Sequence, residues 1–346
     1  MSATIDIAAC TRREAEAWDG FLQSREDSSF YQLFAWKEIN EQCFGHETVY
    51  LAARKEGRVV GVLPLVLVQS RLFGKILCSM PFVNFGGPCA VDADIEGALL
   101  QHAAEEAERR RVDYLELRAT RRFQRAMPTS DHKVSMTIAL NNDPEAQWAA
   151  FKSKHRTAIR RTYKNDIHVE HGREELLDTF YALICAGWRD LGTPIYRKSY
   201  FGEILRRFPE HTRIFVAYQG RKPIAAAFNG YHRGTVEGMW ATVVPEARHL
   251  QPNYVLYWEM IKHACEQGYR RYHLGRSTAG SNAEQFKRKW NAEPQQLYWH
   301  YHLVERKDMP ALNVDNPKFK LAIEAWRRLP VRLTQMMGPL LARSIP

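Results

Sequence analysis

The sequence predicts an α+β fold with mixed β-sheets, built as two similar units within one chain. Three observations lead to this prediction: the length of the chain, a repeated order of elements and a repeated strand motif. With 346 residues, 45% of them hydrophobic, the chain can bury one large core or two of ordinary size. The repeated order of elements and the repeated strand motif favour two cores over one.

A Gly-Arg hairpin occurs twice, at Gly57-Arg58 and at Gly220-Arg221. Each copy is followed, about fifty residues later, by a predicted strand that starts with Tyr and ends with Arg, at 114–118 and 272–276. A further strand and a helix are predicted between hairpin and motif in both copies. We therefore expect one folding unit that is used twice.

The elements follow from hydrophobic periodicity and turn residues. The first unit is predicted to contain helices at 12–25 and 33–43, a hairpin at 48–69, a strand at 76–83, a helix at 96–111 and a strand at 112–118. The second is predicted to contain a helix at 176–191, a hairpin at 214–230, a strand at 235–243, a helix at 254–267 and a strand at 269–274. The expected domains are 1–148, 149–305 and an amphipathic tail, 306–346.

Composition excludes several classes of protein. The six cysteines are scattered without a C-x-x-C pair or His partners at metal-ligand spacing, so neither a disulfide framework nor a metal site is expected. The N-terminus has no apolar signal-peptide core, and the longest apolar run, Val59 to Val68, is too short to span a bilayer. A cytoplasmic protein is expected. The net charge of +10 favours an anionic partner such as nucleic acid, a phosphorylated carrier or lipid headgroups.

Several local motifs are typical of one family. They are the aromatic stretch from Phe30 to Trp36, the turn Phe85-Gly86-Gly87-Pro88, the basic segment 152–164, and Gly275-Arg276-Ser277 followed by Phe286-Lys287-Arg288-Lys289-Trp290. With the order of elements, they resemble the FemAB-like proteins of the GNAT acyltransferase superfamily, which are two fused GNAT-like units. The resemblance covers nearly the whole chain. Residues 191–194 and the tail also resemble the FemAB subgroup associated with exosortase/PEP-CTERM and exopolysaccharide systems.

The resemblance implies transfer of an acyl or aminoacyl group from an activated donor onto an amine. The donor would be a co-substrate that carries phosphates (acyl-CoA, acyl carrier protein or aminoacyl-tRNA), with no tightly bound cofactor and no metal. GNAT enzymes that use coenzyme A hold its pyrophosphate in a glycine-rich loop before a helix. Here that stretch, Arg248 to Tyr254, contains no glycine. This departure leaves the identity of the donor open.

Candidate donor-binding residues lie at two predicted strand and helix ends. Arg276 and Ser277 follow a strand at the sheet edge where ligands of open α/β sheets bind, and Lys287 lies close enough in sequence to share an anion with Arg276. Asn253 and Tyr254 begin a helix, whose N-terminus attracts anions. Salt bridges, a solvated helix face and helix capping are the structural alternatives.

Candidate catalytic residues are Glu237 and His273. Glu237 lies in the strand where GNAT-like proteins often present a base, and strand alternation predicts that Glu237 and Met239 face one side while Val236 and Trp240 face the other. His273 is a candidate because histidine is the residue type most often used as a general acid or base. An exposed strand carboxylate and a core histidine remain the alternatives.

Candidate acceptor-binding residues are mostly aromatic, because the resemblance assigns the acceptor to the first unit. They are Trp36, Phe82, Asn84 and Phe85, together with Trp290 from the second unit. Core packing is the alternative for each aromatic. The segment after Arg118 has no counterpart of the Lys287–Trp290 motif. One competent site is therefore expected, built mainly from the second unit.

Two basic segments are candidates for exposed interaction surfaces. Helix 152–164 carries a broad cationic face, suited to a phosphate-rich donor, an anionic glycan or simple solvation. The tail from 319 to 341 alternates apolar and basic residues, which is compatible with peripheral membrane contact or with packing on the second unit.

We expect a cytoplasmic FemAB-like acyl or aminoacyl transferase, working near the inner face of the membrane, whose acceptor is an amine of the cell envelope, such as peptidoglycan, of a polysaccharide or of a small molecule. A non-catalytic scaffold protein of an exopolysaccharide or envelope pathway is the alternative. Nucleic-acid binding without transfer is a third, and it predicts strong salt dependence.

Overall fold

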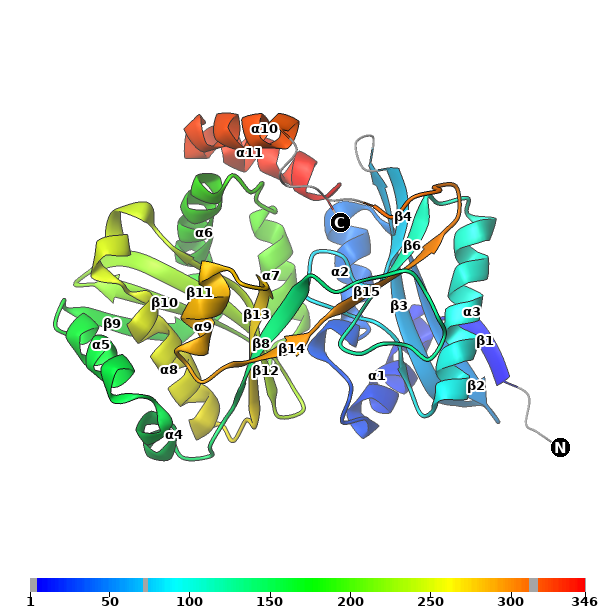
Figure 1. Cartoon of the computed structure of the whole chain (residues 1–346), viewed down its shortest axis with the longest axis horizontal. Coiled ribbons are helices and arrows are strands. Elements are labelled where there is room, and N and C mark those ends of the chain that lie inside the picture. Colours follow the sequence, from blue (N-terminus) through cyan, green and yellow to red (C-terminus); the bar gives the residue numbers. More distant parts are fainter. Residues whose placement is uncertain (1–4, 71–73, 311–316, 346) are drawn as a thin grey trace. The chain divides into compact units, whose positions relative to one another are not determined.

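The computed structural model describes residues 5–70, 74–310 and 317–345, apart from the side chains of 317–319. The chain forms two compact units, each with its own mixed sheet and helices (Figure 1). The first comprises Met1–Ser135, Gln295–Ala311 and Ser344–Pro346, and the second comprises Met136–Pro294 and Leu312–Arg343. The predicted α+β class with mixed sheets is confirmed.

The first unit begins with strand and helix elements that match the sequence pattern closely. They are β1 (Ile5–Ala9), α1 (Ala15–Ser24), α2 (Ala35–Phe44), β2 (Glu47–Lys55), β3 (Arg58–Ser70), β4 (Gly74–Cys78), β5 (Cys89–Ala90), α3 (Ala93–Arg109), β6 (Tyr114–Ala119), β7 (Thr129–Ser130) and, from much later in the chain, β15 (Tyr298–Leu303). The sheet order is β1-β2-β3-β4-β6-β15-β7, with β5 paired to β3.

The core of the first unit lies between α3 and one face of this sheet. Alternate strand residues such as Leu63, Leu65 and Leu115 pack with the apolar stripe of α3, which includes Leu99 and Ala103. The opposite face contacts α1 and α2, where Trp18 stacks on Tyr50 at 5.1 Å between ring centroids. Burial on both faces explains why β3 has a nearly continuous apolar sequence.

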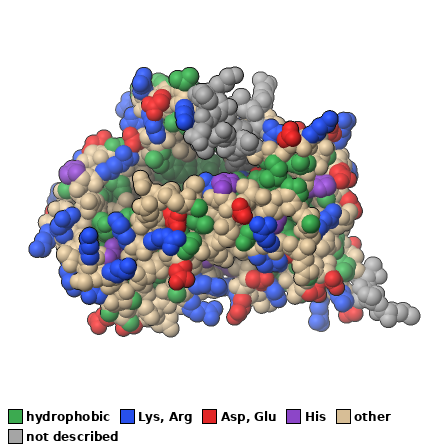
Figure 2. Space-filling model, in the orientation of Figure 1, with side chains coloured by type: hydrophobic (Ala, Val, Ile, Leu, Met, Phe, Trp, Pro, Cys, Tyr) green, Lys and Arg blue, Asp and Glu red, His purple; other side chains and the backbone are tan. Residues whose placement is uncertain are grey.

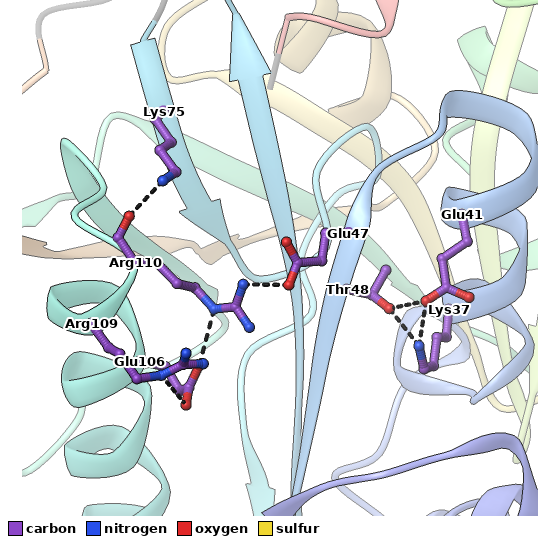
Figure 3. Close-up of polar contacts among 8 residues, drawn as sticks. All are labelled: Lys37, Glu41, Glu47, Thr48, Lys75, Glu106, Arg109 and Arg110. Atoms are coloured by element: carbon purple, nitrogen blue, oxygen red, sulfur yellow. Dashed lines mark hydrogen bonds and ion pairs between the residues drawn. The ribbon is translucent and has the colours of Figure 1, made fainter.

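Ion pairs connect the helices of the first unit to its strands (Figure 3). Arg110, which follows α3, contacts Glu47 of β2 and Glu106 of its own helix. On α2, Lys37 and Glu41 contact each other and both reach Thr48 of β2. These partly exposed pairs fix the helix ends but contribute little stability individually.

The second unit contains the larger share of the helices and the remaining strands. They are β8 (Lys133–Ala139), α4 (Pro144–Ala150), α5 (Ser153–Tyr163), β9 (Ile167–Gly172), α6 (Leu177–Leu191), α7 (Lys198–Arg207), β10 (Thr212–Gln219), β11 (Lys222–His232), β12 (Thr235–Val243), α8 (Asn253–Glu266), β13 (Arg271–Thr278), α9 (Asn282–Arg288), β14 (Glu293–Gln296), α10 (Pro317–Arg328) and α11 (Val331–Ala342). The sheet order is β14-β8-β13-β12-β11-β10-β9.

Helices cover both faces of the second sheet. On one face, Phe180 of α6 and Phe201 of α7 pack edge-on against Phe228 and Trp240 of the sheet. On the other face, α8 contacts β9, β10 and β11. Helices α10 and α11 pack on α6, so the tail is part of the second unit.

Three element boundaries differ from the sequence expectation. The strand expected at 76–83 ends at Cys78, because a buried loop with left-handed Met80 and Phe82 follows it. Strand β13 continues to Thr278 rather than ending at Leu274. Strand β15 lies within the range 149–305 expected for the second unit, yet it pairs with β6 and β7 of the first sheet. Within the described residues, no helix is long and apolar enough to cross a membrane.

Candidate active site

The parallel strands β12 and β13 pair at three positions and then diverge. The paired residues run from Thr235 to Glu237 on β12 and from Arg271 to His273 on β13. Beyond this point β12 continues to Val243, and a cavity of about 460 Å³ lies beside its last residues. Its lining comes from α6, β12, the following loop, α8 and the α9 region: Gly187, Leu191, Ala241, Thr242, Val243, Arg248, Gln251, Pro252, Asn253, Tyr254, Tyr257, Phe286 and Lys289.

The loop between β12 and α8 keeps a tight backbone path without glycine. Residues Pro245–Leu250 form a 3₁₀ helix, and Gln251 then adopts a left-handed conformation with φ of 57°. The Tyr254 N–H donates to the Gln251 carbonyl at 3.1 Å, and α8 begins at Asn253. A glutamine therefore takes a backbone conformation that glycine adopts more readily.

The cavity has a positive electrostatic character. Arg248 and Lys289 line it, and the lining contains no carboxylate. Arg248 is partly neutralised by an ion pair with Asp190, whereas Lys289 lies 5.9 Å from the ring of Phe286. The N-terminus of α8 adds the positive end of a helix dipole. Together these features suit an anionic ligand such as a phosphate group.

Asn253 and Tyr254, expected at the start of a helix, both lie in the cavity wall. The Tyr254 ring contacts the rings of His155 and Phe286, at centroid distances of 5.4 and 5.8 Å. These contacts orient the first turn of α8. The structure thus brings two of the candidate donor-binding residues to a cavity.

Arg276, Ser277 and Lys287 do not line this cavity. The Lys287 ammonium donates to the carbonyls of Gly275 and Arg276 at 2.9 and 3.0 Å. Burial, with the Arg276 charge nearby, lowers the pKa of Lys287 to about 8. In this arrangement Lys287 holds the backbone where Gly275 has a φ of 78°, rather than sharing an anion with Arg276. Ser277 is buried, and its hydroxyl has no hydrogen-bond partner within the part of the chain that the structure describes.

Glu237 and His273 form a buried pair across β12 and β13. They are register partners, and His273 Nδ1 lies 2.8 Å from Glu237 Oε1. The glutamate is 1% exposed, and its second oxygen has no hydrogen-bond partner among the described residues. When the carboxylate accepts from Nδ1–H, the imidazole lone pair is on Nε2. Sequence reasoning named both residues but not their contact.

A β-bulge changes the direction in which Glu237 points. The register places Gly238 opposite Asn229 and Trp240 opposite Phe228, so Met239 is an extra residue. Glu237 pairs with Gly230 and Trp240 with Phe228, so both side chains lie on the face covered by α6 and α7. The expectation that they lie on opposite faces is wrong.

The pair and the cavity are separated along β12. Three residues lie between Glu237 and Ala241, the first cavity-lining residue of β12, which corresponds to about 13 Å of extended strand. Neither Glu237 nor His273 contributes to the cavity wall. A donor that carries its reactive group on a long arm has the reach to connect the two.

Trp290 lies in the core of the second unit. It is fully buried and contacts Phe151, His155 and Tyr257, with centroid distances of 5.5, 4.3 and 5.8 Å. This position favours the packing alternative. Through Tyr257 and Phe286 the same aromatic cluster supports the cavity wall.

The candidate acceptor residues of the first unit are also buried. Trp36 donates its indole N–H to the Phe30 carbonyl at 2.9 Å, and the Asn84 amide donates to the Tyr31 hydroxyl at 2.9 Å. Phe85 packs edge-on against Tyr31. Phe82 packs on Phe44 and His46. Trp36, Asn84 and Phe85 thus surround Tyr31, whereas Phe82 packs in a separate group with Phe44 and His46.

Sequence reasoning missed several cavity residues. Gly187 permits close packing of α6, because a Cβ there would lie 1.7 Å from the Thr242 hydroxyl. The pairs Tyr254–Tyr257 and Phe286–Lys289 each show a three-residue spacing that places both members on one helix face. This three-residue spacing is the feature of the sequence that could have identified these residues as members of one surface. In the part of the chain that the structure describes, no cluster of His, Cys, Asp or Glu is arranged to hold a metal ion.

Comparison with known proteins gives a consistent result. The family described as "Acetyltransferase (GNAT) domain" matches residues 149–288. A search of curated proteins gives no match. Among solved structures, FemX is 14% identical with a TM-score of 0.63, covering 87% of this chain and 98% of FemX. A tandem GNAT protein from the clavulanic acid biosynthesis pathway is 12% identical with a TM-score of 0.55, covering 88% and 100%.

A third similar structure is the C-terminal domain of a putative lysylphosphatidylglycerol synthetase from Agrobacterium fabrum. It is 12% identical with a TM-score of 0.56, covering 83% of this chain and 91% of that domain. At such identities the likeness concerns the fold. Residues 149–288 thus match the GNAT acetyltransferase domain family. The chain as a whole is similar in fold to FemX and to a tandem GNAT protein, in agreement with the resemblance that the local motifs indicated.

Proposed function

We propose that this protein transfers an acyl or aminoacyl group from a phosphate-bearing donor onto an amine of a cell-envelope acceptor. The observation that carries the proposal is the cavity between the end of β12 and the start of α8, which is lined almost entirely by residues within the match to the GNAT domain. Fold relatives named FemX and lysylphosphatidylglycerol synthetase support an envelope acceptor.

The donor's phosphates would bind at the N-terminus of α8. Arg248 and Lys289 supply positive charge there, and Asn253 and Tyr254 supply polar atoms. Acyl-CoA is the donor that this small cavity favours, because its pantetheine arm is narrow and long. The first turn of α8 offers N–H groups to phosphate oxygens even though the preceding loop has no glycine.

The chemistry needs a neutral amine and stabilisation of the tetrahedral intermediate. In the proposed step the amine nitrogen attacks the acyl carbonyl carbon, the bond to the donor's leaving group breaks, and the amine loses one proton. We assign that proton to His273, with Glu237 orienting the imidazole through Nδ1. No covalent enzyme intermediate is needed.

The first unit is proposed to bind the acceptor. Its buried loop after β4 contains two left-handed non-glycine residues, Met80 and Phe82, and such strained backbone is often found at ligand sites. The buried rings of Trp36, Phe82 and Phe85 would position this loop rather than contact the acceptor directly.

The donor is tested by binding and intact-mass measurements with acetyl-CoA, acyl carrier protein and aminoacyl-tRNA, each with an amine panel. The variant Ala241→Trp fills the cavity from an exposed position at its wall and should abolish donor binding. Ala149→Trp, at an exposed position on α4, is the matched control and should bind as the parent does. Equal donor binding by both variants would place the donor elsewhere and contradict the proposal.

The same experiment separates the alternatives. A non-catalytic scaffold protein would show no transfer with any donor and no cavity-dependent binding. A nucleic-acid binder would bind tRNA with an affinity that falls steeply with salt, and Ala241→Trp would leave that affinity unchanged. Charged side chains of both signs are interspersed over the face shown in Figure 2, which disfavours one extended basic track on that face.

A further inference from the structure

Helix α11 packs on the second unit through its small residues. The buried positions are Thr334, Gly338 and Ala342, spaced four residues apart on one face. At Gly338 a Cβ would lie 2.9 Å from the Ile195 backbone nitrogen, so the helix sits close against the chain after α6. The usual arrangement of an amphipathic helix, with large apolar residues inside, is reversed here.

The large apolar residues of α11 face outwards. Met336 is 74% exposed and Leu340 is 59% exposed, and Leu333, Met337 and Leu341 are also exposed. They recur at spacings of three and four residues, so they form one continuous stripe along the helix. We call these five residues the apolar stripe. Contiguous exposed apolar surface of this kind marks an interaction site.

Basic residues border the apolar stripe. On a helical projection of about 100° per residue, Arg332 and Arg343 lie next to the Met336 edge of the stripe and away from the buried face. Both arginines are exposed. Residues 317–346 contain six basic side chains and one acidic side chain, a net charge of +5. The surface is therefore both apolar and cationic.

We propose that the apolar stripe docks α11 onto the surface of a bilayer that contains anionic lipids. The helix has 12 residues and is about 18 Å long, so it lies in the interface rather than spanning it. The stripe enters the boundary between headgroups and acyl chains, and the two arginines contact lipid phosphates. Self-association through the stripe is disfavoured, because it would bring two strongly cationic tails together.

This docking does not depend on the transfer reaction. It uses α10 and α11, whereas the cavity is lined by α6, α8, α9, β12 and the loops beside them. The two surfaces are therefore separable by mutation.

The test is flotation of the full chain with large unilamellar vesicles, either pure phosphatidylcholine or a mixture of phosphatidylglycerol and phosphatidylcholine. We expect binding to the anionic vesicles that weakens with added salt. The double variant Met336→Gln, Leu340→Gln should lower the partition coefficient by about tenfold or more. Val91→Gln removes an apolar residue that is 44% exposed in the first unit and is the matched control, expected to bind as the parent does.

Charge is tested separately with Arg332→Glu, Arg343→Glu, which should reduce binding to anionic vesicles and leave weak binding to neutral vesicles. Circular dichroism and thermal melting check that each variant is folded. Failure of the parent chain to bind either vesicle overturns the proposal, as does binding that the Met336 and Leu340 changes do not affect. A lipid-free dimer that those changes convert to a monomer would identify a second copy as the occupant and would also overturn it.

Discussion

The two units contain the same pair of parallel strands, but the space beside the pair is used differently. In the first unit, β4 ends at Cys78, and the following loop satisfies the backbone of β6: Ser79 N–H donates to the Glu116 carbonyl, and Gly86 N–H donates to the Arg118 carbonyl. In the second unit, β12 continues past the last paired residue and leaves a cavity beside it. In the first unit a loop fills the space beyond the paired strands and supports the structure. In the second unit the space beside β12 is open and offers a binding site.

The arginine of the repeated motif shows the same contrast. Arg118 is 1% exposed, forms an ion pair with Glu116 at 2.7 Å, and lies 4.6 Å from the centroid of the Trp299 ring. Arg276 is only partly buried, and its carbonyl accepts from Lys287. The motif arginine is therefore part of the core in the first unit and lies nearer the surface in the second.

The two parallel strand pairs differ in polarity at one register position. Leu77 is the register partner of Leu115 in the first unit, and at the equivalent place in the second unit Glu237 is the partner of His273. The tyrosines Tyr114 and Tyr272 occupy equivalent positions just before. A polar pair thus stands in one unit where the other has an apolar pair.

The largest expected effect concerns this polar pair. If His273 accepts the proton of the amine, His273→Ala should lower kcat by about 10²- to 10⁴-fold. Glu237→Gln should lower it less, because the amide can still hydrogen-bond to the imidazole although it carries no negative charge. The measurement is the steady-state rate over a pH series with the donor found by screening.

Leu115→Val is the matched change in the first unit, and it should leave kcat unchanged while lowering stability slightly. Equal kcat values for His273→Ala and the parent would show that the polar pair is structural, and the contrast between the two strand pairs would lose its functional meaning.

The next effect concerns the buried ion pair of the first unit. Glu116→Gln leaves Arg118 buried without a counter-charge, which should cost about 3–5 kcal/mol in the free energy of unfolding. Replacing both residues by Leu and Met should restore most of that loss. Chemical denaturation measures both variants.

Glu305→Gln disrupts an exposed pair with Arg111 in the same unit and should cost less than about 1 kcal/mol. If Glu116→Gln also lowered the free energy of unfolding by less than about 1 kcal/mol, another group would have to balance the buried charge of Arg118. The contrast in burial between Arg118 and Arg276 would then have little energetic meaning.

Lys287 makes the stability of the second unit depend on pH. Its pKa is lowered to about 8 in the folded state, so the unfolded chain binds more protons between roughly pH 8 and the ordinary lysine value. Stability should therefore rise with pH through this window, by about 3 kcal/mol at most. Below pH 8 the burial penalty is fully present.

Lys287→Met removes this titration, so the difference between parent and variant, followed by denaturation from pH 7 to 10, isolates it. Lys289→Met, at a neighbouring position, is the control and should leave the slope unchanged. A parent slope no greater than that of Lys287→Met would contradict the lowered pKa.

The smallest expected effect concerns the cations of the cavity. Arg248→Gln and Lys289→Gln should each weaken donor binding by about tenfold, since each removes one charge-assisted contact to a phosphate. Isothermal titration calorimetry gives the affinity. Arg122→Gln, an exposed ion-pair residue of the first unit, should have no effect. Equal affinities for all three variants would indicate that the dipole of α8 suffices, or that phosphates bind elsewhere.

Much of the fold follows from the sequence because most elements are long and periodic. Strand β12 occupies the expected residues 235–243, and α6, α8 and the hairpins lie close to their expected positions. The bulge at Met239 could not be predicted, because one extra residue has no pattern of its own and yet reverses which side chains share a face. The pairing of β15 with β6 could not be predicted from the sequence either, because it joins residues far apart in the chain.

The candidate site was predictable only in part. Asn253 and Tyr254 were identified from the start of a helix, and they do line the cavity. For Lys287, proximity in sequence to Arg276 suggested a shared anion, but the ammonium bonds to carbonyls instead. Sequence spacing places residues near each other without showing whether a side chain points towards a ligand or towards the backbone.

The late position of β15 has a consequence for how the protein is made. Strand β15, at Tyr298–Leu303, lies between β6 and β7 in the first sheet, so that sheet is incomplete until residues 298–303 have been synthesised. Domains usually fold in the order in which they leave the ribosome. Here the N-terminal unit must instead hold an open position beside β6 while all of Met136–Pro294 is translated. A nascent chain halted before residue 298 would therefore expose the edges of β6 and β7.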